Sequence, residues 1–199
     1  AAARGARVVL SSRNTEDLDD IVRHIREAGG LAHAVAADVT NYTEMERIRE
    51  EAEREYGIID TWINNAGTSI FGKILDVPLP EERKLFDVNF WGVRNGCRIA
   101  VDAMRANGGV LMNVGSEVSA AAIPLQGMYS ATKHAVKAYT DALRIELAHD
   151  GIPIAVSLIR PTAIDTPFPE HAVNRLATGA PSLPNPMYHP NVAAEAILR

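Results

Sequence analysis

The stretch Gly109-Val110-Leu111-Met112-Asn113-Val114-Gly115-Ser116 is a short apolar run that ends in a glycine and a serine. A helical pattern follows from about Met128 to His149, and a second apolar run, Ile154 to Ile159, comes after it. A helical crossover of this kind joins two parallel strands, because a tight hairpin can join only antiparallel ones. The stretch therefore predicts a strand–helix–strand unit in a parallel sheet.

The same alternation continues toward the N-terminus. Three further apolar runs are predicted strands: Val8-Val9-Leu10, Leu31 to Ala37 and Ile58 to Ile63. Helical patterns separate them, one ending at Gly29-Gly30, one from Tyr42 to Tyr56, and one from about Pro80 to Asn107. Strands that alternate with helices predict the α/β class. We expect one Rossmann-like domain over residues 1–199, a doubly wound parallel sheet with helices on both faces.

The composition is that of a globular protein, and it excludes several functions. Of the 199 residues, 47% are hydrophobic and 23% are charged, and the formal net charge is −5. That charge offers no positive surface for nucleic acid or for an anionic membrane, and no apolar run is long enough to span a bilayer. Cys97 is the sole cysteine, so we expect no internal disulfide, an inert buried thiol and a reducing, cytoplasmic environment. The six histidines lack metal-ligand spacing, and we predict no metal site.

Polar residues follow each predicted strand directly. In doubly wound sheets, ligands bind beyond the carboxyl ends of the strands, where such residues meet. The clusters are Ser12-Arg13, Asp38, Asn64-Asn65, Gly115-Ser116 and Arg160-Pro161-Thr162. The sequence therefore predicts one ligand-binding crevice at this edge of the sheet.

Tyr129 and Lys133 lie one helical turn apart in the helix that follows Ser116. Residues four apart share a helix face, so a phenol and an ammonium would stand side by side, with a hydroxyl delivered from a strand end. Together these groups could polarise a carbonyl and move a proton. The pair alone also fits a solvated helix face, and its place after a strand end is what favours a site.

Several motifs then resemble those of the short-chain dehydrogenase/reductase family. Asn64-Asn65-Ala66-Gly67 matches its NNAG motif, and Tyr129-Ser130-Ala131-Thr132-Lys133 matches its YxxxK motif. Ser116 stands at the usual spacing before the tyrosine, Asn89 matches the remaining member of the catalytic tetrad, and Pro161 to Thr166 resembles the PGxxxT stretch. The resemblance covers essentially all of the chain, in the family's order, and the motifs together are specific.

The resemblance implies a catalytic role for each of four residues. Tyr129 would be the general acid/base, and Lys133 would lower the pKa of its phenol and hydrogen-bond the nicotinamide ribose. Ser116 would hydrogen-bond the substrate oxygen, although a strand-end cap is the alternative. Asn89 would hold an ordered water in a proton relay, although a buried structural amide is the alternative.

The resemblance also implies a dinucleotide site. Ser12-Arg13 ends the first predicted strand where an acidic residue would select NAD, and Arg13 can pair with a 2′-phosphate, so NADP(H) is favoured over NAD(H). A plain surface arginine is the alternative. Asp38 and Val39 would meet the adenine. The other expected cofactor contacts are Asn65, Ala66 and Gly67 at the adenosine ribose, Tyr129 and Lys133 at the nicotinamide, and Pro161, Ile164 and Thr166 near its carboxamide.

The chain departs from the family pattern in several places. The glycine-rich TGxxxGxG turn is not in it, so we expect roughly a whole βα unit before Ala1, and the family's last strand also lies outside. Gly115 stands where a second serine is common, and Thr162 stands where glycine is usual.

These observations predict an oxidoreductase that transfers a hydride between NADP(H) and a carbonyl or secondary alcohol. The rival predictions are a catalytically silent dinucleotide-sensing or scaffolding protein, and an epimerase or dehydratase on the same fold. A proline-rich loop or lid at 167–190 and the Ala120 to Gln126 loop would line a pocket for a hydrophobic substrate. Small residues on the Tyr129 helix predict a homodimer or homotetramer interface, with packing against the sheet as the alternative: Ala131, Ala135, Ala138 and Ala142.

Overall fold

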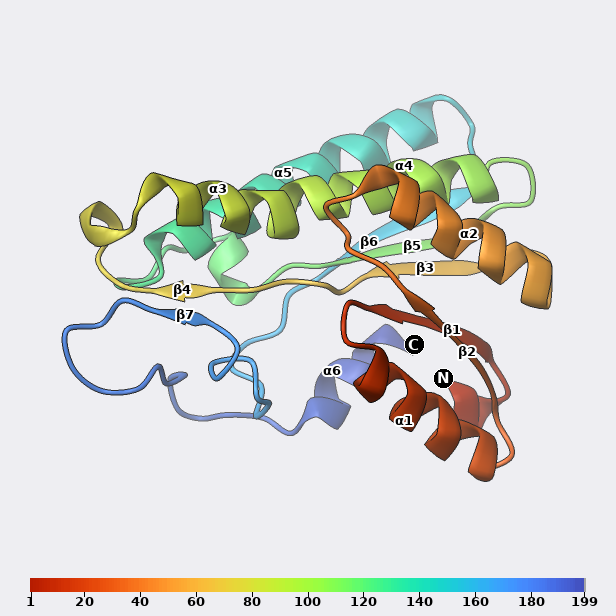
Figure 1. Ribbon diagram of the computed structural model, residues 1–199. Coiled ribbons are helices and arrows are strands. Elements are labelled where there is room, and N and C mark those ends of the chain that lie inside the picture. Colours follow the sequence, from red (N-terminus) through yellow and green to blue (C-terminus); the bar gives the residue numbers. More distant parts are fainter. Residues whose placement is uncertain (199) are drawn as a thin grey trace.

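The structure, a computed structural model, describes residues 1–198 and contains two parallel sheets (Figure 1). A three-stranded sheet has the order β3–β5–β6, formed by Thr61–Asn64, Gly109–Val114 and Ile154–Ile159. A two-stranded sheet pairs β1 (Arg7–Ser12) with β2 (Leu31–Ala36). All of these pairs are parallel, so the α/β prediction is confirmed. The sheet expected from the sequence is present in two parts, and the break lies between β1 and β3.

Helices cover both sides of this layer (Figure 1). On one side lie α2 (Tyr42–Tyr56), α3 (Leu79–Phe86), α4 (Gly92–Met104) and α5 (Gly127–His149). On the other side lie α1 (Thr15–Glu27), which packs against β1 and β2, and α6 (Pro190–Ile197). This is the Rossmann-like arrangement, with helices on both faces of parallel strands.

The helix starts show why these segments are helical. Asn14 caps α1 by accepting from the backbone N–H of Glu16 at 3.1 Å, and Asn41 caps α2 by accepting from that of Thr43 at 3.1 Å. An asparagine side chain in this position satisfies an amide that the helix itself leaves unpaired. At the other end of α2, Gly57 adopts φ 83°, a left-handed conformation that favours glycine.

The helix predicted over Pro80 to Asn107 is interrupted. A π-helical turn, Asp87–Trp91, separates α3 from α4. Such turns occur frequently at functional sites, and this one carries Asn89. A short parallel pair was also not predicted, β4 (Ile70–Phe71) with β7 (Val173–Asn174), which ties the proline-rich segment to the rest of the fold.

The main core lies between the helices α4 and α5 and the strand β5. Its most buried side chains include Met104, Leu111 and Val136. Cys97 belongs to the same core, and burial raises the pKa of its thiol to about 11. A thiol that stays protonated at neutral pH is a poor nucleophile, which agrees with the inert cysteine expected from the sequence.

Candidate active site

Three of the predicted site residues meet where β5 ends beside the first turn of α5. Ser116 follows β5 directly, and its side chain hydrogen-bonds the phenol of Tyr129. On the same helix, the Nζ atom of Lys133 lies 5.7 Å from the centroid of the Tyr129 ring. The side chains of Tyr129 and Lys133 are both buried. The structure therefore brings a hydroxyl, a phenol and an ammonium together in one place.

Lys133 is buried without a carboxylate partner among residues 1–198. Its Nζ donates to the backbone carbonyl of Val114 at 2.8 Å. Desolvation lowers the pKa of the ammonium to about 8, which leaves it mostly charged at neutral pH. An ammonium has three N–H bonds, so two of them remain for a ligand.

Tyr129 lies in an apolar environment. It belongs to a cluster with Ile70, Val118 and Leu85, and the ring of Phe168 lies 6.0 Å from its own, centroid to centroid. Burial raises the pKa of the phenol to about 12, against the opposing effect of the Ser116 hydrogen bond. The lowering expected from Lys133 is not seen: burial sets the direction of the pKa shift, and the ammonium donates to the Val114 carbonyl instead of to the phenol.

The structure shows the strand-end cap considered for Ser116, and its bond to a substrate oxygen stays a prediction. Its Oγ accepts from the backbone N–H of Val118 at 3.3 Å and so caps a short 3-10 turn, Glu117–Ser119. A hydroxyl has two acceptor lone pairs and one donor, so the cap leaves capacity for Tyr129. The glycine before it also has a reason. A Cβ on Gly115 would lie 2.9 Å from Ser119 Oγ and 3.0 Å from Leu158 Cδ1, so the serine common at this position in the family would require these two side chains to shift.

Asn89 uses its amide to hold the chain after β3 against α5. Its Oδ1 accepts from the backbone N–H of Thr68 at 2.8 Å, and its Nδ2 donates to the Thr68 carbonyl at 2.9 Å. Nδ2 also lies 3.1 Å from Thr132 Oγ1, which in turn donates to the Tyr129 carbonyl at 2.7 Å. The geometry supports the structural amide that was the alternative from the sequence, and the proton relay stays a prediction.

The residues predicted to bind the adenine end lie at the ends of β1 and β2. Arg13 is largely exposed, with a guanidinium nitrogen 3.8 Å from a carboxylate oxygen of Asp38. Burial opposes ionisation of Asp38, but hydrogen bonds from Thr40 and the charge of Arg13 outweigh it, so the pKa of the carboxyl is lowered. Ser12 accepts from the backbone N–H of Asn14, and the Val39 carbonyl accepts from Asn95.

The remaining predicted residues lie in two loops. Asn65, Ala66 and Gly67 form an exposed turn after β3. A Cβ on Gly67 would lie 3.4 Å from Asn89 Oδ1 and 3.7 Å from Lys133 Nζ, so this turn passes close to the ammonium. Pro161, Ile164 and Thr166 follow β6, and the Pro161 carbonyl accepts from the backbone N–H of Glu117 at 2.9 Å.

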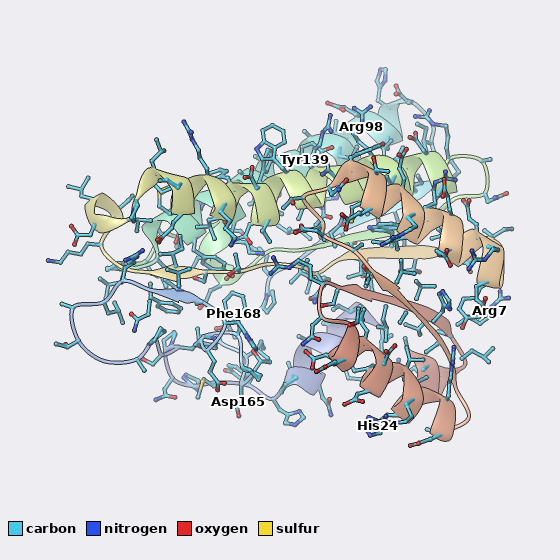
Figure 2. All side chains as sticks on the ribbon, viewed as in Figure 1. Arg7, His24, Arg98, Tyr139, Asp165 and Phe168 are labelled. Atoms are coloured by element: carbon cyan, nitrogen blue, oxygen red, sulfur yellow. The ribbon has the colours of Figure 1, made fainter. Side chains whose placement is uncertain are left out.

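The proline-rich segment lies against the site. Figure 2 labels Phe168 on it and Asp165 just before it, beneath the strands, and Phe168 contacts Tyr129. Two backbone bonds from β7 and the residue after it hold the segment, Val173 N–H to the Ser69 carbonyl at 2.9 Å and Arg175 N–H to the Phe71 carbonyl at 2.7 Å. Arg175 also forms an ion pair with Glu81 at the start of α3. A two-residue strand pairing so distant in sequence leaves no periodic signal, which is why sequence reasoning missed it.

Two further residue groups bear on what the site can hold. Within residues 1–198, no group of three or more His, Cys, Asp or Glu side chains is placed to hold a metal ion. His134, next to Lys133 in sequence, bonds through Nδ1 to the Ser130 carbonyl at 2.9 Å.

Across the same residues, none of the helices combines the length and apolarity needed to cross a lipid bilayer.

The parallel strands and the cluster at their carboxyl ends define a Rossmann-like protein with a site beside the first turn of α5. The model of the short chain dehydrogenase family matches residues 1–176. The chain belongs to the short-chain dehydrogenase family.

Relatives and solved structures agree with this family. The chain is 39% identical over 200 residues to the uncharacterized oxidoreductase YxnA of Bacillus subtilis, covering 100% of this chain and 56% of that protein. It is 36% identical over 169 residues to 3beta-hydroxysteroid dehydrogenase 1 of Eggerthella lenta, covering 83% of this chain and 64% of the relative. The chain thus spans a little over half the length of YxnA.

Two solved structures share the fold. An alcohol dehydrogenase from Thermococcus sibiricus complexed with 5-hydroxy-NADP has a TM-score of 0.85 and 26% identity, covering 98% of this chain and 80% of that one. A short chain dehydrogenase/reductase from Burkholderia phymatum in complex with NAD has a TM-score of 0.83 and 27% identity, covering 85% of this chain and 61% of that one.

Proposed function

We propose that the protein is an NADP(H)-dependent oxidoreductase that interconverts a carbonyl compound and a secondary alcohol. The observation that carries the proposal is the hydrogen bond between Ser116 and Tyr129 beside the buried ammonium of Lys133. A catalytically silent dinucleotide-sensing protein would not need a phenol, a hydroxyl and a desolvated ammonium in one site. Because the chain covers only part of its relatives' length, the activity of the whole protein is a proposal.

The three side chains have distinct roles in this reaction. In the reducing direction, Tyr129 donates its phenolic proton to the substrate oxygen, and the Ser116 hydroxyl hydrogen-bonds the same oxygen as negative charge develops on it. Lys133 stabilises the phenolate that remains, since an opposite charge nearby favours the ionised form. A phenol pKa of about 12 keeps Tyr129 protonated at neutral pH, the form that acts as the general acid in carbonyl reduction.

The residues present fit a nicotinamide dinucleotide. Two N–H bonds of the Lys133 ammonium have no partner among residues 1–198, and the Gly67 backbone passes close to this ammonium. Lys133 would bind the nicotinamide ribose, Asn65, Ala66 and Gly67 the adenosine ribose, and Ile164, Thr166 and Pro161 the carboxamide end. When bound, the nicotinamide supplies the hydride that the protein itself lacks.

The substrate that this site favours is hydrophobic. Tyr129 is surrounded by Ile70, Val118 and Phe168, and the segment 167–190 acts as a lid over it. A relative of 36% identity carries the name 3beta-hydroxysteroid dehydrogenase 1, which supports a bulky apolar alcohol as the substrate class. Asn89 holds the turn after β3 in place and, in this proposal, also supports the proton relay.

The experiment that tests the function measures NADPH oxidation by the full-length protein with a panel of hydrophobic ketones and aldehydes. We expect turnover with at least one bulky ketone. Tight NADPH binding without turnover on any member of the panel would favour the dinucleotide-sensing alternative. Product without net NADPH consumption would favour an epimerase or a dehydratase.

The cofactor preference rests on Arg13, whose exposed guanidinium stands at the end of β1. A charge-assisted bond to a 2′-phosphate is worth about 1.5–3 kcal/mol, so Arg13→Ala should raise the Kd for NADPH about 10- to 100-fold. The Kd for NADH should change less than about threefold, because NADH lacks that phosphate. Arg23→Ala, at an exposed arginine on α1, serves as the control for fluorescence titration. Equal losses for both cofactors would remove the basis for an NADP preference.

We also propose that α5 pairs with a second copy in a cytoplasmic homodimer or homotetramer. Ala131, Ala138 and Ala142 are exposed in the single chain, so they do not pack against the sheet, and Ile145 on the same helix is 69% exposed. Small side chains let a second helix approach closely. Ala138→Glu should convert the assembly to a monomer in sedimentation equilibrium, because a buried unpaired carboxylate is costly. A wild-type protein that is already monomeric at micromolar concentration contradicts this proposal.

A further inference from the structure

A pair of buried amides joins two neighbouring strands near their carboxyl ends, beneath the site. Asn64 of β3 and Asn113 of β5 are register partners at the end of their pairing. Nδ2 of Asn64 donates to Oδ1 of Asn113 at 2.8 Å, and Trp62 Nε1 donates to Asn64 Oδ1 at 2.8 Å. The pair is packed so closely that a Cβ on Gly96 of α4 would lie 1.9 Å from Asn64 Oδ1.

A second bond ties this pair to the helix that carries Lys133. Nδ2 of Asn113 donates to Oγ1 of Thr140 at 2.9 Å, and Thr140 donates to the Val136 carbonyl at 2.7 Å. Asn113 and Thr140 are both fully buried. Thr140 stands two helical turns after Lys133, so the two residues lie on the same face of α5. The bond from Asn113 therefore fixes where this face of α5 sits along β5.

The residue after Asn113 is Val114, whose carbonyl accepts from Lys133 Nζ at 2.8 Å. Two bonds thus connect β5 to one face of α5, Asn113 to Thr140 and Val114 to Lys133. No other hydrogen bond or ion pair of Lys133 occurs within residues 1–198, so the direction of its two free N–H bonds depends on the position of this carbonyl. On the other strand, the chain leaves Asn64 toward Gly67, which approaches the same ammonium.

We propose that Asn113 and Thr140 are positioning residues for Lys133, and that the bond between them holds the Val114 carbonyl where it aims the ammonium at the cofactor ribose. The inference rests on the proposed function, because it assigns a task to Lys133 in cofactor binding. Without the Thr140 hydroxyl, a buried donor of Asn113 loses its partner, and the strand end must shift or the amide must turn to satisfy it. A small displacement of the carbonyl then redirects the N–H bonds of Lys133.

The groups around Lys133 make its protonation a useful readout. On its own helix, the titratable neighbour is the Tyr129 phenol. From β5 it faces the neutral Val114 carbonyl, and from the turn after β3 and the π-helical turn it faces Gly67 and the neutral amide of Asn89. The Cys97 thiol of α4 contacts Asn113 and stays protonated, since burial raises its pKa. Water entering a loosened site would raise the pKa of Lys133 from its lowered value.

The test compares Thr140→Val with Thr140→Ser in the full-length protein, by fluorescence titration with NADPH from pH 6 to pH 10 and by urea unfolding. Valine keeps the shape and removes the hydroxyl, whereas serine keeps the hydroxyl. We expect Thr140→Val to weaken NADPH binding about fivefold to tenfold, the worth of one hydrogen bond. The alkaline limb of its binding curve should move to higher pH, and Thr140→Ser should restore most of the affinity.

Leu147→Val is the matched control, because Leu147 is buried on the same helix but lies outside this network. It should lower stability without changing the pH dependence of NADPH binding. Should Thr140→Val not fold, Thr140→Ala should show the same changes at smaller size, since water can replace the lost hydroxyl. Lower stability with wild-type NADPH affinity and an unmoved alkaline limb would overturn the inference. Failure of the proposed function is a separate outcome, NADPH binding by the wild type without turnover.

Discussion

Tyr129→Phe is expected to lower the rate of NADPH-dependent carbonyl reduction by about 10²- to 10⁴-fold, the usual contribution of a positioned general acid. The substitution removes one oxygen atom and leaves the ring, so the contacts of that ring with Phe168 and with the surrounding apolar cluster remain. NADPH binding should change little, because Lys133 keeps its bond to the Val114 carbonyl.

The pH dependence of stability gives this variant a second signature. Burial raises the pKa of the Tyr129 phenol from 10.0 to about 12, so the folded protein holds this proton more tightly than the unfolded chain. That stabilisation is complete below about pH 10 and is lost as the pH rises from about 10 to about 12. Tyr129→Phe removes the titration, so the variant should lose less stability than the wild type across that window.

The measurement is NADPH consumption at saturating ketone, together with urea unfolding at several pH values. Tyr56→Phe provides the control, because this phenol is at the C-terminal end of α2 beside Arg7, at the start of β1 and away from the strand end that carries Ser12 and Arg13. A Tyr129→Phe protein with more than a tenth of the wild-type kcat would show that another group delivers the proton. Ser116 would then be the next candidate, since its hydroxyl is bonded to the phenol.

Much of the fold could be predicted because its signals are local. The bounds of α2 and of the strands β5 and β6 agree with the predicted Tyr42–Tyr56, Gly109–Val114 and Ile154–Ile159. Apolar periodicity and a terminal glycine decide such segments within a few residues. The π-helical turn at Asp87–Trp91 has no such signal, because it accompanies bonds that Asn89 makes to Thr68 in another part of the chain.

The site was predictable in position but not in its electrostatics. Strand ends meet at one edge of a parallel sheet, and this geometry places Ser116 beside Tyr129 and Lys133. The direction in which the pKa of the Tyr129 phenol shifts depends on burial and on which group accepts the hydrogen bond from Lys133. A sequence motif reveals neither. A signal for Asn113 was present, since an asparagine inside an apolar strand must find a buried partner. Its partner, Thr140, could be known only from the packing of α5 on β5.

Lys133→Met is the second substitution with a large expected effect. It should lower the rate of carbonyl reduction and raise the free energy of unfolding at pH 7. Methionine has a similar length and no charge, so it cannot bind the ribose hydroxyls or stabilise a Tyr129 phenolate. We expect kcat/KM for NADPH-dependent reduction to fall by about 10²- to 10³-fold, since the variant loses both cofactor binding and charge stabilisation.

Stability should change in the opposite direction because the ammonium is desolvated without a carboxylate partner. Its pKa falls from 10.5 to about 8, which corresponds to about 3 kcal/mol of unfavourable free energy in the charged, folded state. Methionine avoids that cost but leaves the Val114 carbonyl without its donor, a loss of about 1 kcal/mol. The free energy of unfolding at pH 7 should therefore rise by about 2 kcal/mol.

The sign of the pH dependence separates this explanation from a simple gain in packing. Between about pH 8 and pH 10.5 the folded wild type binds fewer protons than the unfolded chain at Lys133, so its free energy of unfolding rises with pH across that window. Lys133→Met lacks this rise, so its advantage over the wild type should shrink from pH 8 and become a deficit of about 1 kcal/mol, the lost Val114 hydrogen bond, above pH 10.5. Better packing would give an advantage independent of pH. Lys137→Met, one turn further along α5 at a partly exposed ion pair with Asp141, should change stability by less than about 1 kcal/mol. If Lys133→Met is instead less stable than the wild type at pH 7, the ammonium contributes to the fold, and the conflict between stability and function at this position does not exist.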